Sequence, residues 1–185
     1  MKEKVTVNLN SASLYEEPDT FLYGFIRRLK YSNILRIIKL YKKEKSKFSL
    51  LEIGTGSGFL MKFIEKKYPQ ATLKGIEYDP RLVALTKSKV LKAEIVQGNA
   101  EDFDLLEKEF DLIVSLQVIE HLYRPEKLLI SVKKHLNKDG VFIFTTPNTH
   151  SIGARIMKNS WHGYRDDHVS LKSYQEWKKF LEDNG

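Results

Sequence analysis

Residues 50–59 of this 185-residue chain read LLEIGTGSGF, an apolar run that ends in an acid and continues with glycines at alternate positions. The pattern predicts a strand, a tight turn and the start of a helix. Gly54, Gly56 and Gly58 permit positive φ and leave no Cβ in the way, so a nucleotide-like ligand can lie against bare backbone at a helix N-terminus. The alternative is a tight connection without a ligand. The chemistry indicated is the binding of a small-molecule cofactor.

The spacing of these glycines separates cofactor classes. A dinucleotide fingerprint, G-x-G-x-x-G, requires its third glycine where this chain has Phe59, so the spacing argues against NAD or FAD. The Lys-Ser or Lys-Thr pair of a P-loop is also absent from the turn. An NAD-dependent oxidoreductase is therefore a disfavoured alternative.

Four further segments follow the glycine turn in a fixed order. With the turn, they make residues 48–184 resemble the class I S-adenosylmethionine (SAM) dependent methyltransferases, in particular the subgroup that includes the ubiquinone-biosynthesis O-methyltransferases. The resemblance lies in the order of the segments more than in any single motif. The segments are KGIEYDP (74–80), VQGNAED (96–102), FDLIVSLQVIEHL (110–122) and LNKDGVFIFTTPN (136–148).

The resemblance implies that SAM is the cofactor and gives roles to acids at strand ends. Glu77 ends the second expected strand, where a carboxylate can accept both ribose hydroxyls. Glu52 would lie close to the amino acid portion of SAM, where a carboxylate complements the ammonium and the sulfonium. Tyr78 either lies against the adenine face or packs within the protein.

The loop after the third expected strand provides the adenine contact by the same resemblance. Asn99 stands where the family often has an aspartate that accepts the adenine amino group, and its amide oxygen can accept the same bond. Glu101 or Asp102 could share this contact. After the fourth strand, backbone contacts are expected more than side-chain contacts. The predicted cofactor-binding set is Glu52, Gly54, Thr55, Gly56, Gly58, Glu77, Tyr78, Asn99, Ala100, Leu116 and Gln117.

Two histidines are candidate catalytic residues. Methyl transfer from a sulfonium needs alignment and exclusion of water, and a base becomes useful when the acceptor is a hydroxyl. His121 belongs to a Glu-His pair common in the subgroup, and His168 lies on a late loop expected to cover the acceptor pocket. A structural, hydrogen-bonded role is the alternative for each.

No role is expected for the remaining histidines, His135, His150 and His162. We also expect no metal site, because no set of histidines and acids has convincing ligand spacing. Asp166 and Asp167 with the adjacent His168 would need further ligands from elsewhere.

Strands and helices alternate from residue 48 onward, which predicts an α/β fold with a Rossmann-like, doubly wound, mostly parallel sheet. A capping box, Ser173 to Glu176, begins a last helix with Tyr174, Trp177 and Leu181 on one face. The region 149–170 is expected to be a loop. The expected strands are 48–53, 72–77, 94–97, 110–115 and 140–146, and the expected helices are 57–68, 80–90 and 125–136.

The family fold would continue with a final antiparallel strand pair, for which no residues follow Gly185. The strand at 140–146 would then be a sheet edge with an apolar face toward solvent. A shortened chain is the favoured explanation. The alternative is another chain, such as the partner in a dimer, that covers the edge.

Residues 1–47 are predicted to form an arm and an amphipathic helix (about 21–44) on the substrate side of a SAM-binding domain, residues 48–185. In this helix Ile34, Ile37, Ile38 and Tyr41 recur at helical spacing beside a basic face. A solvated basic face is favoured. Contact with an anionic membrane surface, or with RNA or an acidic ligand, is the alternative.

Composition limits the class of protein. The chain is 42% hydrophobic and 30% charged and has no stretch of 18 apolar residues, which predicts a soluble globular protein. No apolar signal segment follows Met1, and there is no cysteine, so a cytoplasmic location is expected. The net charge of +7 is spread along the chain and forms no block.

These observations predict a SAM-dependent methyltransferase for a small-molecule or lipid-like acceptor, with O-methylation favoured over N- or C-methylation. Nucleic-acid acceptors are disfavoured, because Ser115-Leu116-Gln117 replaces the Asn/Asp-Pro-Pro-aromatic signature of amino-directed nucleic-acid methyltransferases. The alternative function is a non-catalytic SAM-binding subunit that partners an active methyltransferase.

Overall fold

The computed structural model describes residues 31–32, 34–40, 47–105, 109–161 and 163–184. The chain divides into two compact units, Met1–Lys43 and Glu44–Gly185. In the first unit the described residues are helical, with Ile34 and Ile38 buried and Arg36 and Lys39 exposed, as the sequence predicts. Ile37 is exposed, so the apolar stripe is narrower than expected. The rest of the predicted helix and the arm lie outside the described residues.

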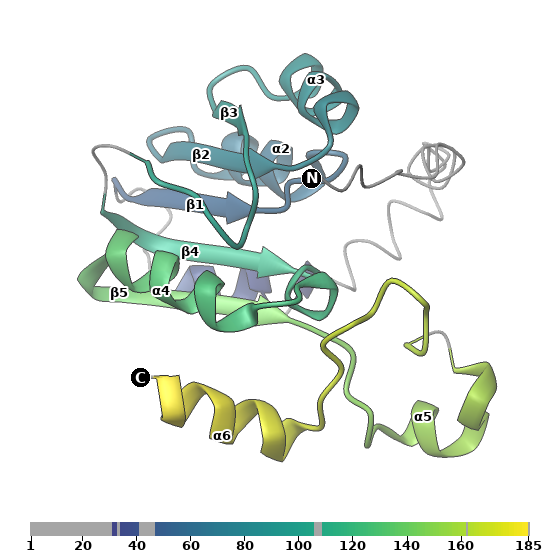
Figure 1. The fold of residues 1–185 in the computed structure, drawn as a ribbon. Helices are drawn as coiled ribbons and strands as arrows, with labels where there is room; N and C mark the ends of the chain where they lie inside the picture. The colour runs from purple at the N-terminus through teal and green to yellow at the C-terminus, as the bar shows by residue number, and fades with distance from the viewer. Residues whose placement is uncertain (1–30, 33, 41–46, 106–108, 162, 185) are drawn as a thin grey trace, which may run out of the picture. The chain divides into compact units, whose positions relative to one another are not determined.

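The second unit contains a five-stranded parallel sheet with the strand order β3-β2-β1-β4-β5. Parallel pairing brings the carboxyl ends of the strands to one edge (Figure 1), where open α/β sheets bind ligands. The predicted Rossmann-like fold is confirmed. The strands are β1 (Ser49–Ile53), β2 (Thr72–Glu77), β3 (Glu94–Gln97), β4 (Phe110–Leu116) and β5 (Leu136–Thr145).

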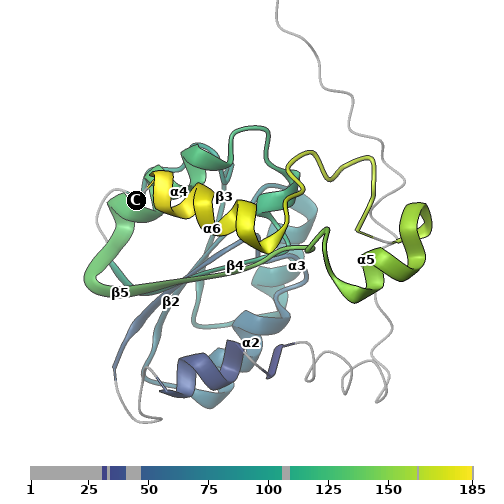
Figure 2. The ribbon, with the colours of Figure 1, turned by 90° about the horizontal axis from the view of Figure 1, so that it is seen from below.

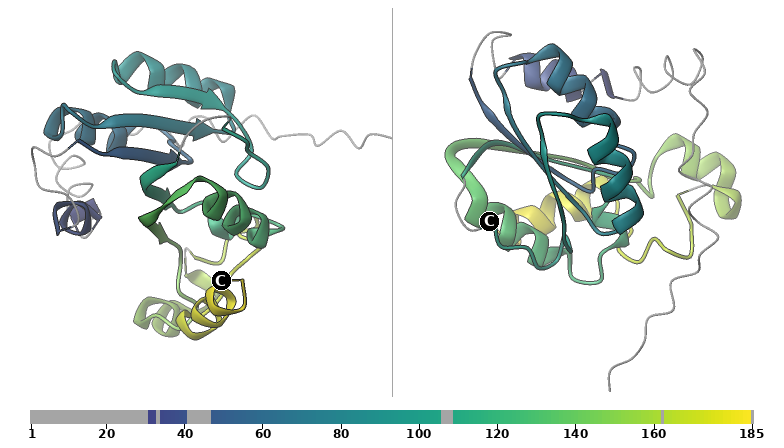
Figure 3. Two further views of the ribbon diagram at one scale, coloured as in Figure 1. Left: turned by 90° about the vertical axis from the view of Figure 1, so that its left-hand side faces the viewer. Right: turned by 90° about the horizontal axis from the view of Figure 1, so that it is seen from above.

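Helices cover both faces of the sheet (Figures 2 and 3). Helices α2 (Phe59–Lys67) and α3 (Pro80–Lys89) lie on one face, and α4 (Pro125–His135) and α6 (Tyr174–Asn184) lie on the other. The Asp79 carboxylate caps α3 by accepting from Arg81 N, and proline occupies the first turn of both α3 and α4. Among the described residues, no helix combines the length and apolar character needed to span a bilayer.

Strand β5 begins earlier than the sequence predicts. Leu136 pairs with Phe110, and the ladder resumes with Val141 opposite Leu112. The intervening Asn-Lys-Asp-Gly sequence, typical of a turn, is absorbed as an irregularity within the strand. The tertiary pairing with β4 therefore overrides the local turn signal.

Helix α6 covers one face of β5, although the sequence suggested that the apolar face of this strand would meet solvent. Trp177 is buried and packs edge-on against Phe144, with 5.9 Å between ring centroids. The predicted capping box forms, because Ser173 N donates to Glu176 Oε2 at 2.7 Å and Glu176 N donates to Ser173 Oγ at 3.3 Å. Tyr174, expected on the packed face, is 67% exposed. Strand β5 is still the last strand in the order.

Between β5 and α6, the described residues 146–161 and 163–172 form an excursion that leaves the sheet edge and returns to it. The expected loop contains a short helix, α5 (Ile152–Met157), and a 3-10 turn, η3 (Lys158–Ser160). The helix starts where Ser151 Oγ accepts from Ala154 N, a cap that the sequence analysis did not identify. An isolated parallel bridge between Asn148 and Lys172 joins the two ends of the excursion.

Candidate active site

The glycine turn begins where β1 ends and leads directly into α2. Gly54, Gly56 and Gly58 have φ values of 78°, 52° and 74°, the left-handed region that side chains disfavour. The amides of Gly54 and Thr55 donate to Ile76 O at 2.8 and 3.2 Å. The turn is therefore fixed to the carboxyl end of β2 and is ordered by main-chain bonds.

The three glycines face different surroundings. A Cβ on Gly54 would overlap the Val118 side chain, and a Cβ on Gly58 would lie 2.8 Å from Thr86 Cγ2. A Cβ on Gly56 would meet nothing within 4 Å among the described residues. Gly54 and Gly58 thus allow close packing, whereas Gly56 presents bare backbone to open space.

Glu77 is a buried carboxylate at the end of β2 that holds the turn. Its Oε2 accepts from Gly56 N at 2.8 Å, and its Oε1 accepts from Asp79 N at 3.0 Å. An ionised carboxylate has about four acceptor positions, so two remain for a ligand. Both oxygens are therefore oriented before any ligand arrives.

Thr86 is a supporting residue that the sequence analysis missed. It is fully buried on α3, and its hydroxyl donates to Gly56 O at 2.9 Å. Because the side chain comes from a separate helix, the turn geometry depends on how α3 packs. In the sequence, Thr86 is only a threonine within the helix expected at 80–90, and its contact with the turn becomes evident in the structure alone.

Three buried polar side chains at the ends of β1 and β4 have atoms without a hydrogen-bond partner among the described residues: Glu52 Oε2, Thr55 Oγ1 and Ser115 Oγ. Burial raises the pKa of the Glu52 carboxyl well above its usual value, and the charge on Glu77 raises it further. Buried polar groups are normally satisfied, so this part of the edge is suited to a polar, cationic ligand.

In the loop after β3, which is predicted to contact adenine, some hydrogen-bonding groups are already bonded within the protein. Asn99 is exposed, and its Oδ1 accepts from Glu101 N at 2.9 Å. Glu101 accepts from Arg124 N at 2.7 Å and is therefore occupied, unlike the exposed Asp102. Ala100 is buried and Tyr78 is 62% exposed.

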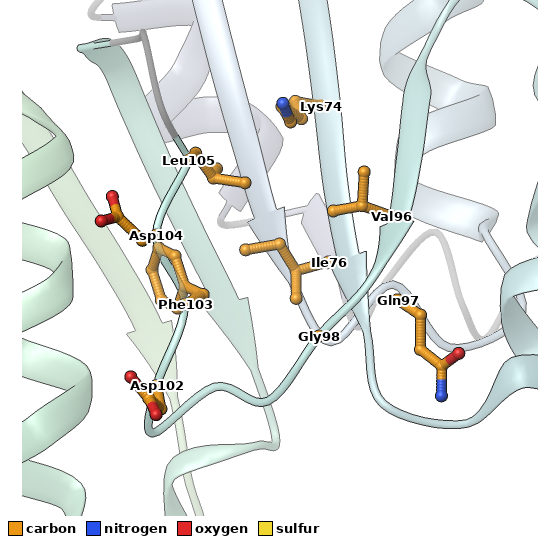
Figure 4. Close-up of a pocket in the computed structure, with 9 residues that line it drawn as sticks. All are labelled: Lys74, Ile76, Val96, Gln97, Gly98, Asp102, Phe103, Asp104 and Leu105. Atoms are coloured by element: carbon orange, nitrogen blue, oxygen red, sulfur yellow. The ribbon is translucent and has the colours of Figure 1, made fainter.

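A cavity of about 380 Å³ lies next to this loop, between β2, β3 and residues 102–105 (Figure 4). Neither the glycine turn nor Glu77 lines it, so the cavity borders the site and does not contain it. The described residues between β3 and β4 form no helix. Its lining residues are Lys74, Ile76, Val96, Gln97, Gly98, Asp102, Phe103, Asp104 and Leu105.

Leu116 and Gln117 leave β4 at the same edge. Leu116 pairs with Thr145 of β5. Gln117 has a positive φ of 57°, and its side-chain Nε2 donates to Thr145 Oγ1 at 3.3 Å. The Gln117 side chain is thus directed to β5, and a contact of this segment with a cofactor stays a prediction.

The two candidate catalytic histidines meet just beyond β4. His121 belongs to the 3-10 turn η2 (Ile119–His121), and His168 comes from the excursion. Their ring centroids are 4.7 Å apart, and one ligand atom from each lies within 4.8 Å of a carboxylate oxygen of Glu120. No role for Glu120 itself was predicted from the sequence.

His135 and His150 do not belong to the cluster formed by this pair and Glu120. His135 is buried on α4, where its Nδ1 lies 2.7 Å from Ser131 O and its Nε2 accepts from Leu105 N at 3.0 Å. His150 is exposed in a turn, and His162 lies outside the described residues. Asp166 is exposed, and the Asp167 carboxylate accepts from Arg165 Nε at 3.0 Å.

Comparison with known proteins identifies the family. The family model described as "Methyltransferase domain" matches residues 25–185. A malonyl-[acyl-carrier protein] O-methyltransferase of Bacillus cereus is 23% identical over 126 residues, which are 67% of this chain and 46% of that protein. A probable S-adenosylmethionine-dependent methyltransferase of Mycolicibacterium smegmatis is 30% identical over 115 residues, 61% of this chain and 44% of that protein. The chain thus spans less than half the length of these relatives.

A solved structure with the same fold is the plantazolicin methyltransferase BpumL in complex with a pentazolic desmethylPZN analog and SAH. It has a TM-score of 0.74 and 22% identity, with 94% of this chain and 68% of that chain covered. The predicted class of protein is confirmed, whereas the ubiquinone-related subgroup stays a prediction. By its sheet, its glycine turn and its match over residues 25–185, the chain belongs to the methyltransferase-domain family of enzymes, whose cofactor is S-adenosylmethionine.

Proposed function

We propose that the chain binds SAM across the glycine turn and transfers its methyl group to an oxygen of a small-molecule or lipid-like acceptor. The observation that carries the proposal is the Glu77 carboxylate, buried and bonded to Gly56 N, beside the open Cα of Gly56. Two free acceptor positions on Glu77 suit the two ribose hydroxyls, and bare backbone at Gly56 lets the adenosyl group approach closely.

The amino acid portion of SAM belongs at Glu52 in this proposal. The ammonium and the sulfonium are both positive, and the buried Glu52 carboxyl has an oxygen without a partner among the described residues. A bound cation would favour the ionised carboxylate and so oppose the upward pKa shift that burial causes. At the same strand ends, Thr55 and Ser115 offer hydroxyls that have no partner among the described residues.

The adenine ring belongs on the side of Asn99, Ala100 and Tyr78. Asn99 Oδ1 keeps one acceptor position after its bond to Glu101 N, which is sufficient for the adenine amino group. The exposed Tyr78 ring is available to stack on the base. Backbone groups of Leu116 and Gln117 complete the proposed contacts.

Methyl transfer needs little from the protein beyond alignment. The acceptor oxygen forms a bond to the methyl carbon as the carbon–sulfur bond breaks, and the pair of electrons in that bond stays on sulfur as S-adenosylhomocysteine leaves. An acceptor hydroxyl also loses its proton, and His121 or His168 is the proposed base. An oxygen acceptor is supported by the Bacillus cereus relative, whose name specifies O-methylation.

Two measurements test this function. Calorimetric titration of the chain with SAM, S-adenosylhomocysteine and NAD is expected to show binding of both adenosyl ligands and none of NAD; the reverse pattern would overturn the proposal. Incubation with methyl-labelled SAM and a panel of acceptors, including quinol precursors, carboxylic acids and lipid extracts, then identifies the acceptor atom.

A second candidate is a non-catalytic SAM-binding subunit that partners an active methyltransferase. It is favoured by the position of β5 at the end of the sheet, where a further strand can pair. Turnover by the isolated chain would exclude this candidate. SAM binding without turnover, restored when a second protein is added, would support it.

A further inference from the structure

Glu120, His121 and His168 form a cluster at the carboxyl edge of the sheet. One possible ligand atom from each side chain lies within 4.8 Å of those of the other two. Atoms that share a cation at bond lengths near 2 Å lie roughly 3–4 Å apart, so small side-chain rotations close the set. The cluster is therefore compact enough to hold one ion.

Both histidines present a nitrogen with a free lone pair. His121 Nδ1 lies 2.9 Å from Asp167 O, and His168 Nδ1 lies 2.7 Å from Gly163 O. A carbonyl oxygen only accepts, so each Nδ1 carries the proton and each Nε2 of the neutral ring does not. An Nδ1–H held by a backbone carbonyl is the usual support of a histidine that ligates metal through Nε2.

His135 provides an internal contrast. Its Nδ1 lies 2.7 Å from Ser131 O, and its Nε2 accepts from Leu105 N at 3.0 Å, so both nitrogens are used within the protein. Among the described residues, neither His121 nor His168 has a hydrogen-bond partner for Nε2. A purely structural histidine would resemble His135.

Glu120 points independently to a ligand. Its side chain is fully buried, and neither carboxylate oxygen has a hydrogen-bond partner among the described residues. The hydroxyl of Thr146 likewise has no hydrogen-bond partner among the described residues. A buried carboxyl with two unsatisfied oxygens is costly unless a partner binds it.

The backbone holds the two halves of the cluster together. Ser170 N donates to Glu120 O at 2.9 Å, and His168 precedes this bond by two residues. On the opposite side, Val118 packs against Gly54 of the glycine turn. The cluster thus lies close to the glycine turn that is proposed to bind SAM.

We propose that Glu120, His121 and His168 bind a divalent transition-metal cation, which in turn binds the acceptor oxygen. Two imidazole nitrogens and one carboxylate oxygen suit ions such as zinc, cobalt or iron(II) better than magnesium or calcium, and three protein ligands leave positions for an acceptor. With the cation bound, both rings are ligands and neither is the base. The cation would lower the pKa of a bound hydroxyl, whose proton then goes to water before the oxygen takes the methyl group. The acceptor role rests on the proposed function, whereas cation binding does not.

The test uses Co²⁺ as a probe, because its visible absorption reports nitrogen and carboxylate ligation. Chelator-treated protein is titrated with Co²⁺, and the wild type is expected to bind one equivalent. Glu120→Gln and His168→Ala should each weaken binding by at least about tenfold. His150→Ala, at an exposed histidine in a turn, is the control and should bind as the wild type does.

Each outcome decides the question. No cobalt spectrum in the wild type, unchanged affinity in both cluster variants, or equal weakening by His150→Ala would overturn the proposal. If Glu120→Gln does not fold, as judged by circular dichroism, His168→Ala at a partly exposed position carries the test. SAM binding is measured separately without Co²⁺. If the wild type does not bind SAM, the proposed function is contradicted, whereas the proposal of a cation site is unaffected.

Discussion

The glycine turn and the cluster of Glu120, His121 and His168 lie at the same edge of the sheet but are constructed differently. The turn is contiguous in sequence and held by bonds that it already makes, to Ile76 O and to the Glu77 carboxylate. The cluster joins η2 to the distant excursion and leaves two carboxylate oxygens without partners among the described residues. The first region is organised before a ligand binds, whereas the second has interactions still to be made.

This difference has a physical consequence for how substitutions act. In the turn, a changed residue removes a native contact and a ligand contact together, so stability and affinity should fall in parallel. In the cluster, Glu120→Gln changes a carboxyl group that has no partner among the described residues, so ligand binding should fall more than stability. The predictions below test the first half of this statement, and the cobalt experiment tests the second.

The largest effect is expected for Gly56→Val, which should abolish detectable SAM binding in calorimetry. The backbone at φ 52° disfavours a β-branched residue, at a cost of about 1–3 kcal/mol, and the side chain would occupy the space proposed for the adenosyl group. Gly56→Ala should be milder. Gly153→Ala is the control, because its Cβ would meet only contacts of 3.4 Å or longer. Unchanged SAM affinity in Gly56→Val would show that the cofactor does not bind across the turn.

Next comes Glu77→Gln. The amide oxygen can still accept from one ribose hydroxyl, so the loss of the other charge-assisted bond, about 1.5–3 kcal/mol, should weaken SAM binding about 10- to 100-fold. The thermal midpoint should also fall, because an amide cannot accept from both Gly56 N and Asp79 N as the carboxylate does. Glu94→Gln, at an exposed acid on β3, is the matched control. A drop in SAM affinity with an unchanged thermal midpoint would contradict the expectation that stability and affinity fall together.

Glu52→Gln should separate stability from binding. The folded-state pKa of Glu52 is raised, so its favourable contribution to stability is present below the unfolded pKa and is lost as pH rises through the folded pKa. The variant should therefore be more stable than the wild type at neutral pH, with an advantage that shrinks on acidification, and should bind SAM less tightly. Thermal denaturation across pH tests the sign. A variant less stable at neutral pH would disprove it.

The smallest effect is expected for Thr86→Val. The exchange keeps the shape and removes the hydroxyl that donates to Gly56 O, a bond worth about 0.5–1.5 kcal/mol. Denaturant unfolding should show that loss, and SAM affinity should fall only a few-fold. Thr72→Val, at an exposed position in β2, is the control. Equal effects of the two substitutions would mean that α3 does not support the turn.

The sequence predicted those parts of the molecule in which local pattern and tertiary environment agree. Strands β2 and β3 have the predicted bounds, and the glycine turn follows β1 as expected, because turn glycines and apolar runs act over a few residues. The bounds of β5 were wrong at its start, where pairing of Leu136 with Phe110 overrides a turn-like sequence. Helix α5 was missed, since Ser151 was not interpreted as its cap.

The candidate site shows the same limit. Glu77 was predicted to bind ribose because it ends the second expected strand after the glycines and because the family resemblance implies that role. Thr86 was missed, because its contact with Gly56 O depends on how α3 packs across the turn. Glu120 and His168 were not linked, because only the return of the excursion brings them together. Pairings between distant segments carry no periodic signal in the sequence.

The bridge between Asn148 and Lys172 has a consequence for the diversification of this protein. Because the stem of the excursion is closed by backbone pairing, its contents can lengthen or change while the chain still enters α6 at the same point. The entropic cost of a longer loop grows only with the logarithm of its length. Changes in acceptor specificity can thus arise by replacing the segment between Asn148 and Lys172, while the glycine turn and Glu77 stay the same.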